Sequence, residues 1–554
     1  MNRREFLKTT GASGLALVAP ITLSSKASAA DFAPVGQYFV FAHLGGGWDP
    51  TTFCNPKGNK LRSVVNAELP VPGSRVTRGE SPVNRFPESA IRRAADIYIG
   101  SGTVSTNVTY APYLGTYNEL AADDSIDDGS ANDGFSIEHI RRILAGSIDL
   151  VGSEITAAAD GLNWASVDKT VVKTNAEAIL EGSVTNIVLG TITGANAGQV
   201  RNRNGNLDNS FDGANIDADV FRYDAFVCLY AHQMRVLNGV DNQTNSHDTG
   251  TRYADTGSMS MGYPDFSALY AAVHGASRPL AWMTDGRGND ETAGIVARSS
   301  ASDANFFGIL ANPKNGMVDF VDTELEQAQA LRKEIQARKD NLPLRRQLQD
   351  QLYLVRESGG EFSSVASDIL NPTTNAQQAV QALATNSTRR HMRVGAAGFY
   401  TGMASSMQVG FGGFDTHGNH DNSHFARIRT VLEDLHFLFK ALDSYEVLEQ
   451  TTVIVGSDFG RTPWFNDGNG KDHWAVSSYL LFGNHVAGGT EVNATNGLVN
   501  AVNVDNSGSD IVVGGSTRMT AAHLHKQLRK KAGIESAAET LQFPIEVGEL
   551  NMFG

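Results

Sequence analysis

The sequence predicts an α/β fold in which a mostly parallel central sheet is covered by helices on both faces. Short apolar runs that end in glycine or a polar turn occur at residues 37–44, 451–458 and 478–484, and they are typical of buried strands. Longer segments with helical periodicity lie between them, and such alternation favours a parallel sheet. With 554 residues, 41% hydrophobic and 19% charged, the chain is globular and can build a large core.

The individual elements follow from local signals. QYFVFAHL at 37–44 is the first strand, and it ends in GGGWD. Helices are expected at 217–237 and at 263–275, the latter entered through Pro264 and ended by Gly275. A third helix at 421–443 places one apolar face toward the core, and that face consists of Phe425, Ile428, Val431, Leu432, Leu435 and Leu438.

Two further helical segments are expected. Residues 322–357 are rich in Glu, Gln, Lys, Arg and Leu, and Pro343 should break this segment into a bent pair. A helix near the C-terminus contains His523 and His525, which do not share a face and are interpreted as structural.

The N-terminus carries the pattern of an export signal. Arg3 and Arg4 precede a weakly apolar stretch and the small-residue site Ala27-Ser28-Ala29, so residues 1–29 are expected to be a signal peptide for the twin-arginine translocase. Residues 30–554 are then one domain, with an insertion-rich part at 55–215. Within that part, alternate Asn and Asp residues at 204–208 lack the Glu that closes a calcium loop, which favours a solvated loop.

Charge and composition exclude several partners. The formal net charge is −15, and removing residues 1–29, which carry a net +3, leaves about −18. Such a surface repels nucleic acid and anionic lipid, so no nucleic-acid partner is expected. No mature segment has eighteen uninterrupted apolar residues, so no transmembrane segment is expected. Cys54 and Cys228 are too few for a cysteine-rich zinc site, and Cys54 is interpreted as a packing residue or as half of a disulfide.

Three acidic residues follow expected strands. Asp49 comes after the first strand, Asp415 after SSMQVGFGGF, and Asp458 after TTVIVGS. If these strands are parallel neighbours, the three carboxylates meet at one edge of the sheet. Carboxylates with imidazoles suit zinc, manganese or iron, and the histidines expected to join them are His417, His420 and His473. The alternative is that each Asp only caps a helix.

Four sequence blocks carry a resemblance to a known family. GGGWDPTTFCNP, SHDTGTRYADTG, GFDTHGNH and VGSDFGRTPWFNDGNGKDHW resemble the blocks of an exported bacterial family of unknown function, DUF1501, which is grouped with the alkaline phosphatase and sulfatase superfamily. The resemblance implies an alkaline phosphatase-like fold with a two-metal site. Asp49 and Asp458 would serve one metal, and the other would be held by Asp415, by His420 or His417, and by His473.

The same resemblance implies a two-step hydrolysis. The hydroxyl of Ser246, or less favourably Thr249, would attack the ester, and a metal-bound hydroxide would then release the product. Arg461 and the metals would stabilise charge on the equatorial oxygens. The superfamily's Asp-His pair appears here as Asp458-Phe459, so one imidazole ligand is missing, and that metal site is expected to be weak, empty or rebuilt with His247 or His417. The alternative reading is that Ser246 and Thr249 only cap a helix.

The expected function is an exported, periplasmic or secreted, metal-dependent hydrolase of phosphate or sulfate esters. Its substrate would be a small-molecule or glycan ester, and its cofactor one or two divalent ions, with zinc preferred and manganese, magnesium or calcium as alternatives. The second hypothesis is a catalytically degenerate binding or structural protein that keeps the fold.

Overall fold

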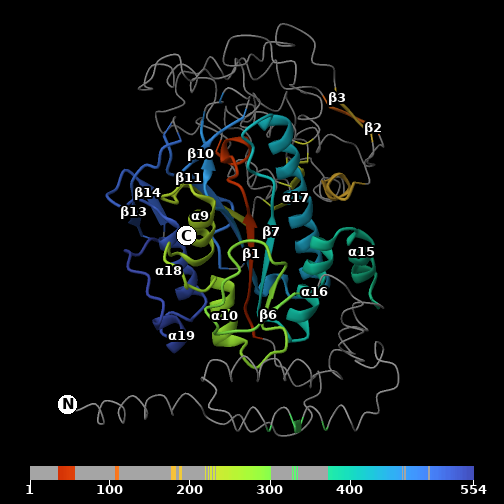
Figure 1. Ribbon diagram of the computed structural model, residues 1–554. Helices are drawn as coiled ribbons and strands as arrows, with labels where there is room; N and C mark the ends of the chain where they lie inside the picture. The colour runs from red at the N-terminus through yellow and green to blue at the C-terminus, as the bar shows by residue number, and fades with distance from the viewer. Residues whose placement is uncertain are drawn as a thin grey trace, which may run out of the picture.

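The computed structural model describes residues 35–55, 107–110, 176–182, 186–189 and 233–300, and 372–554 apart from a few short gaps, together with single positions within 219–230 and 327–334 (Figure 1). The expected signal peptide and the 204–208 loop lie outside these residues. So does most of the expected helical segment 322–357.

An eight-stranded sheet forms the centre of the described structure, in the order β12-β4-β11-β8-β1-β7-β5-β6. The pairings run parallel throughout except at β11, which is antiparallel to both of its neighbours. The sheet is therefore mixed and largely parallel. Its strands are β1 Tyr38–Leu44, β4 Met234–Asp241, β5 Trp282–Thr284, β6 Arg298–Ser299, β7 Ser406–Phe411, β8 Thr451–Ser457, β11 Val476–Phe482 and β12 Thr490–Asn493.

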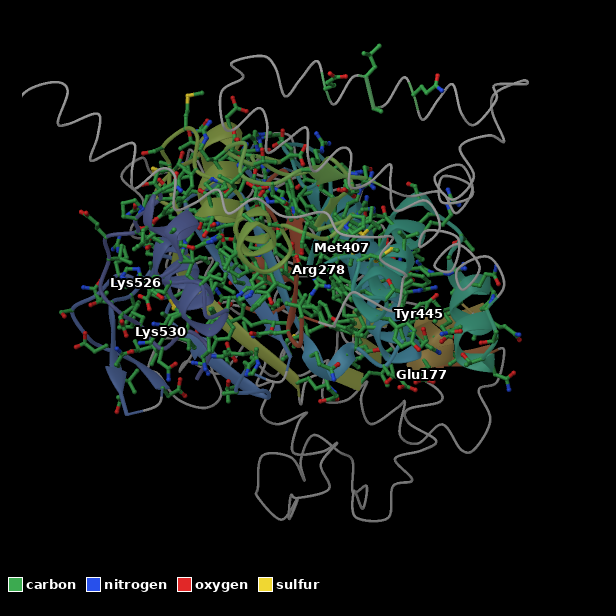
Figure 2. All side chains as sticks on the ribbon, turned by 90° about the horizontal axis from the view of Figure 1, so that it is seen from below. Glu177, Arg278, Met407, Tyr445, Lys526 and Lys530 are labelled. Carbon is green, nitrogen blue, oxygen red and sulfur yellow. The ribbon has the colours of Figure 1, made fainter. Side chains whose placement is uncertain are left out.

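Helices cover both faces of this sheet, as the sequence predicts (Figure 1). One face carries α15 (Asn375–Leu383), α16 (Ser387–Tyr400) and α17 (His420–Ser444), and the other carries α9 (His247–Thr256), α10 (Phe266–His274) and α18 (Ala521–Lys531). Viewed from below, Lys526 and Lys530 of α18 lie on one side and Tyr445, just after α17, lies on the other (Figure 2). The architecture is thus a three-layer α/β arrangement.

The alternation of side chains along β1 divides the core into two. Val40 and Ala42 point into the apolar cluster that contains Leu435 of α17, whereas Phe39 and Phe41 point into the cluster that contains Leu524 of α18. Successive side chains of a strand face opposite sides, so a strand buried on both faces reads as one continuous apolar run. This explains why the central strands were recognisable from sequence.

Short elements complete the described structure. They are the 3-10 helices η2 (Pro50–Thr52) and η7 (Leu448–Gln450), the helix α19 (Ala538–Leu541), and the strand pairs β2 (Asn107–Tyr110) with β3 (Asn186–Leu189), β9 (Gly460–Arg461) with β10 (His473–Trp474), and β13 (Val504–Ser507) with β14 (Asp510–Val513). None of the helices that the structure describes combines the length and the apolarity needed to cross a bilayer.

One sequence prediction needs correction here, and one pair of alternatives is narrowed. The expected helix 217–237 extends too far, because residues 234–241 form β4 in the interior of the sheet. The strand reads MRVLNGVD, and its buried Arg235, Asn238 and Asp241 interrupt any alternation of apolar and polar residues, so no period of two marked it as a strand. For Cys54 the structure agrees with the first of the two alternatives: its thiol is free and buried, so the residue packs in the core, whereas Cys228 lies outside the described residues.

The exit loops of β7, β1 and β8 lie side by side, because these three strands are adjacent and parallel. The loop after β1 passes very close to the loop after β7. A Cβ on Gly46 would lie 2.4 Å from the backbone nitrogen of Asp415, and Gly46 has φ of +118°. Only glycine fits such a position, so Gly46 sets how closely the two loops approach.

Candidate metal centre

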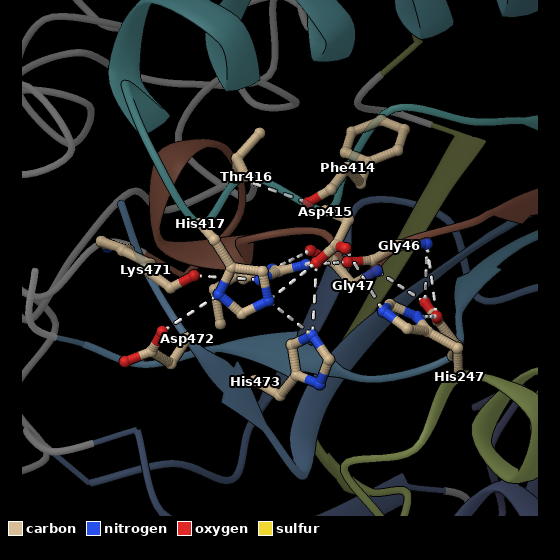
Figure 3. Close-up of polar contacts among 12 residues, drawn as sticks. Gly46, Gly47, His247, Phe414, Asp415, Thr416, His417, Lys471, Asp472 and His473 are labelled. Atoms are coloured by element: carbon tan, nitrogen blue, oxygen red, sulfur yellow. Dashed lines mark hydrogen bonds and ion pairs between the residues drawn. The ribbon is translucent and has the colours of Figure 1, made fainter. Parts of the chain in front are cut away.

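Five side chains from four segments meet at this edge of the sheet, and Figure 3 labels His247, Asp415, His417 and His473 among them. Asp415 and His417 lie in the loop after β7, and Asp458 directly follows β8. His247 is the first residue of α9, and His473 lies on β10, which pairs with β9. Segments more than 200 residues apart in sequence thus supply one cluster.

The Nε2 atoms of the three histidines point toward Asp415. His417 Nε2 and His473 Nε2 are 3.0 Å apart, and they lie 3.1 Å and 3.2 Å from Asp415 Oδ1. His247 Nε2 lies 3.6 Å from the other oxygen, Asp415 Oδ2. His247, Asp415 and His473 each offer a ligand atom within 4.8 Å of the others.

The opposite nitrogen of each ring contacts an acceptor. His417 Nδ1 is 3.0 Å from Asp472 Oδ1, and His473 Nδ1 is 2.7 Å from the carbonyl oxygen of Asn245. His247 Nδ1 is 2.6 Å from Asp458 Oδ2. Because carboxylate and carbonyl oxygens only accept, each Nδ1 must carry the proton and donate it. In the neutral ring, Nε2 then presents a lone pair.

These lone pairs fit a cation. Two imidazole nitrogens and a carboxylate oxygen at 3.0–3.2 Å repel one another unless a proton or a positive ion lies between them. Donors that bind one zinc ion at 2.0–2.1 Å in a tetrahedron are separated by about 3.3 Å. A histidine whose Nδ1 donates to a carboxylate or a carbonyl is the usual arrangement around a bound metal. The donor set therefore suits zinc.

The cluster is partly exposed to solvent on the side of Asp415 and His417. The side chains of Asp415 and His417 are 49% and 47% exposed, whereas Asp458 behind them is only 1% exposed. Burial raises the pKa of Asp415, but the hydrogen bond from Arg461 and the adjacent ring of His473 outweigh it and lower that pKa to about 2. Asp415 is therefore an anion at neutral pH.

Asp458 is also held as an anion. Burial raises its pKa, but the hydrogen bond from His247 and the nearby charge of His43 lower it overall. The amide of Gly47 donates to Asp458 Oδ1 at 2.6 Å, and the amide of Gly46 donates at 3.2 Å. The hydrogen bond to Asp458 in turn raises the pKa of His247. The glycine-rich loop after β1 thus orients Asp458, and Asp458 orients His247.

Arg461 has a different position from the one expected. Its side chain is fully buried, and its three nitrogens donate to the carbonyl oxygens of Gly47, Gly46 and Lys471, with a further bond to Asp415 Oδ1 at 2.7 Å. Four of the five N–H groups of the guanidinium thus have acceptors within the protein. The structure therefore makes Arg461 a residue that positions Asp415 and the glycine-rich loop.

Asp49 lies in a separate, buried polar cluster. Its Oδ2 accepts from Lys471 Nζ at 2.6 Å and lies 3.1 Å from His420 Nε2, and its Oδ1 accepts from the hydroxyl of Thr51 at 2.6 Å. Burial raises the pKa of Asp49, but the charge of Lys471 lowers it well below its usual range. The sharing of one metal by Asp49 and Asp458, expected from the resemblance, is not the arrangement found, because Lys471 provides the positive charge at Asp49.

The choice between His417 and His420 is also resolved by this geometry. His417 faces Asp415 and His473, whereas His420 is buried and contacts Asp49 and Thr416. The neighbouring His424 accepts from the backbone amide of Asp49 at 2.8 Å, and burial lowers its pKa well below the ordinary value. His420 and His424 therefore anchor α17 to the loop after β1.

Sequence reasoning missed two polar residues. Lys471 and Asp472 directly precede His473 in a polar loop, where neither shows a periodic signal. Phe459, which stands where the resembled superfamily has a histidine, packs its ring against His247 and His473 at centroid distances of 4.8 Å and 4.3 Å. An apolar wall therefore supports the two histidines.

The two candidate nucleophiles lie at the start of α9. Ser246 occupies the N-cap position, is exposed, and makes no side-chain capping bond, which differs from the capping alternative. Thr249 is half-buried and lies in the first turn of the same helix. Ser246 directly precedes His247, and Asn245 accepts from His473, so Ser246 lies between two residues that contact the centre.

Fold and site together define a mixed α/β protein with a candidate metal centre at the carboxyl edge of its sheet. The profile of the family "Protein of unknown function (DUF1501)" matches residues 228–540, which is more than half of the chain, and the chain therefore belongs to this family. No curated protein and no solved structure matches the chain.

Proposed function

We propose that this chain is a metal-dependent hydrolase of phosphate or sulfate esters, with Ser246 as its nucleophile. The observation that carries the proposal is the convergence of His247, His417 and His473 on Asp415, with every Nδ1 held by an acceptor. Protein sites with imidazole and carboxylate ligands and an open side are typical of catalytic zinc.

The residues of the chain have distinct roles in this proposal. His247, His417, His473 and Asp415 hold the ion, which when bound supplies Lewis acidity and lowers the pKa of a nearby hydroxyl. Asp458 and Asp472 orient two of the histidines. The first turn of α9 presents backbone amides that favour an anionic ester group.

Ser246 would perform the covalent step. Its oxygen forms a bond to phosphorus or sulfur while the bond to the leaving oxygen breaks, and the hydroxyl proton passes through solvent to that oxygen. Water then cleaves the seryl ester and restores the hydroxyl. An alkaline phosphatase-like fold is part of this proposal, and the largely parallel sheet with its site at the carboxyl edge supports it.

The location belongs to the proposal as well. We propose that residues 1–29 direct export through the twin-arginine translocase to the periplasm or the medium. The twin arginines and the Ala27-Ser28-Ala29 site support this. The substrate would then be a small-molecule or glycan ester outside the cytoplasm.

One observation favours a second function. Asp49 is neutralised by Lys471 and Arg461 donates to backbone carbonyls, so the site has fewer free groups than a two-metal phosphatase requires. A metal-binding protein of the same fold that does not turn over esters fits this reduced set.

One experiment separates the two functions. The mature protein is purified from its native compartment, its metal content is measured by mass spectrometry, and turnover of an aryl phosphate and an aryl sulfate is followed. Bound zinc with turnover of either ester supports the hydrolase. Bound zinc with no turnover of either supports the binding protein, and a metal-free protein that takes up no added zinc contradicts both.

A further inference from the structure

A buried ion pair ties the far end of α9 to the sheet. His43 Nδ1 of β1 lies 2.8 Å from Asp255 Oδ1 of α9, and the two side chains are 3% and 1% exposed. Burial lowers the pKa of His43, but the charge of Asp255 and its hydrogen bond outweigh this and raise the pKa to about 9. His43 is therefore an imidazolium at neutral pH, although it lies in the core.

The same carboxylate contacts a second strand and a loop. Asp255 Oδ2 accepts from the side-chain amide of Gln408 on β7 at 3.2 Å and from the backbone amide of Asn289 at 2.8 Å. The strands β1 and β7 are those whose exit loops carry Gly46, Gly47 and Asp415. The side chain of Asp255 on α9 thus contacts both strands whose exit loops lead into the metal centre.

The near end of α9 is held independently. His247 donates to Asp458. Gly250 packs so closely against the backbone of Asp458 that a Cβ on Gly250 would lie 2.4 Å from the carbonyl oxygen of Asp458. His247 and Asp255 are eight residues apart, which is about 12 Å along a helix. A rigid helix of this length transmits a displacement of one end to the other.

We propose that His43 and Asp255 are positioning residues for the metal centre, which hold α9 in the register that brings His247 Nε2 to Asp415. The inference rests on the proposed function, because it concerns the same metal centre. Neither side chain contacts a proposed ligand atom, so the pair acts on the centre through α9, and the charge of His43 also lowers the pKa of Asp458.

A matched buried pair elsewhere provides the control. Arg389 of α16 donates to Asp434 of α17 at 2.5 Å, and these side chains are 13% and 4% exposed. Asp434 lies fourteen residues beyond the start of α17 and contacts none of the site residues in the described structure. Loss of either pair should weaken the fold, but only loss of the His43–Asp255 pair should alter the metal centre.

The test uses the full mature chain loaded with zinc or with Co²⁺. In His43→Gln and in Asp255→Asn, we expect zinc affinity, measured by chelator competition, to fall about tenfold, as is typical for outer-shell partners. The Co²⁺ absorption spectrum should change as well. Asp434→Asn should lower the melting temperature but leave the affinity and the spectrum unchanged. Unchanged zinc affinity in a folded His43→Gln or Asp255→Asn protein would overturn the inference.

A measurement on the wild-type chain applies even if those variants fail to fold. Coupling between two sites is reciprocal, so zinc should slow amide exchange at 253–256 and at Asn289 as well as at 247–250. Exchange at 434–438 serves as the reference and should not change. Slower exchange confined to 247–250 would contradict the positioning role of His43 and Asp255. A wild-type chain that binds no zinc would contradict the metal centre itself.

Discussion

His417 Nε2 and His473 Nε2 lie 3.0 Å apart, although each ring donates its Nδ1 proton to an acceptor. Two lone pairs at this distance, with the Asp415 carboxylate beside them, form an arrangement that a cation stabilises. This relationship is the basis of the first prediction.

His473→Ala should lower zinc stoichiometry and weaken zinc affinity by at least tenfold, because it removes a direct ligand. Folding should change little, since the His473 side chain is 21% exposed to solvent and is not part of the apolar core. The measurement is metal content after chelator treatment and reloading. His485→Ala, which changes an exposed histidine outside the centre, is the control and should match the wild type. Full metal content in His473→Ala would exclude His473 as a ligand.

Ser246→Ala should reduce the rate of ester turnover about a thousandfold or more. Zinc content should be retained, because the hydroxyl is the proposed nucleophile and not a ligand. Thr249→Ala is the natural comparison, since Thr249 lies on the same turn of α9. It should retain most of the activity. The reverse outcome, with Thr249→Ala inactive and Ser246→Ala active, would transfer the nucleophile to Thr249.

Gly250→Ala should displace α9 from the Asp458 loop, because the added Cβ would lie 2.4 Å from the carbonyl oxygen of Asp458. We expect a lower melting temperature and a loss of zinc affinity of roughly tenfold, of the size seen for outer-shell changes. Gly548→Ala is the control, since nothing lies within 4 Å of a Cβ at that position. Equal affinity in the two variants would show that α9 tolerates the shift.

Lys471→Met should destabilise the folded protein by about 3–5 kcal/mol, because it leaves the carboxylate of Asp49 buried without its cation. Denaturant unfolding of the variant and of the wild type measures this difference. Lys530→Met removes an exposed ion pair with Glu549 and should have no measurable effect. The double variant Lys471→Met with Asp49→Asn should recover part of the loss. If the losses of unfolding free energy in the two single variants simply added in the double variant, Lys471 and Asp49 would not be paired.

The His43–Asp255 pair should make stability depend on pH on the alkaline side. The folded-state pKa of His43 is about 9, above its ordinary value of 6.5, so the folded protein binds this proton more tightly than the unfolded chain. The resulting stabilisation, at most about 3 kcal/mol, is fully present below pH 6.5 and is lost as the pH rises through 9. The unfolding free energies of the wild type and His43→Gln should therefore differ most near pH 6 and converge above pH 9. A difference that stays constant over this range would contradict an imidazolium at His43.

Much of the fold was predictable because it depends on local patterns. The strands near 37–44 and 451–458, the helix α17 and its buried face all follow from the period of apolar residues. The meeting of the loops after β1, β7 and β8 follows from the rule that parallel strands end at one edge. The boundary near 234 was misplaced, because the buried polar residues of β4 leave it without the alternation that marks a strand.

The sequence by itself determined the sheet, its helical layers and the set of polar residues that reach its carboxyl edge. Only the tertiary structure decided which of these residues face one another: His417 rather than His420 beside Asp415, Lys471 at Asp49, and Arg461 on backbone carbonyls. The physical reason is that side-chain direction and burial in loops depend on contacts between segments far apart in sequence, such as α9 against the Asp458 loop. No periodic pattern within one segment encodes those contacts.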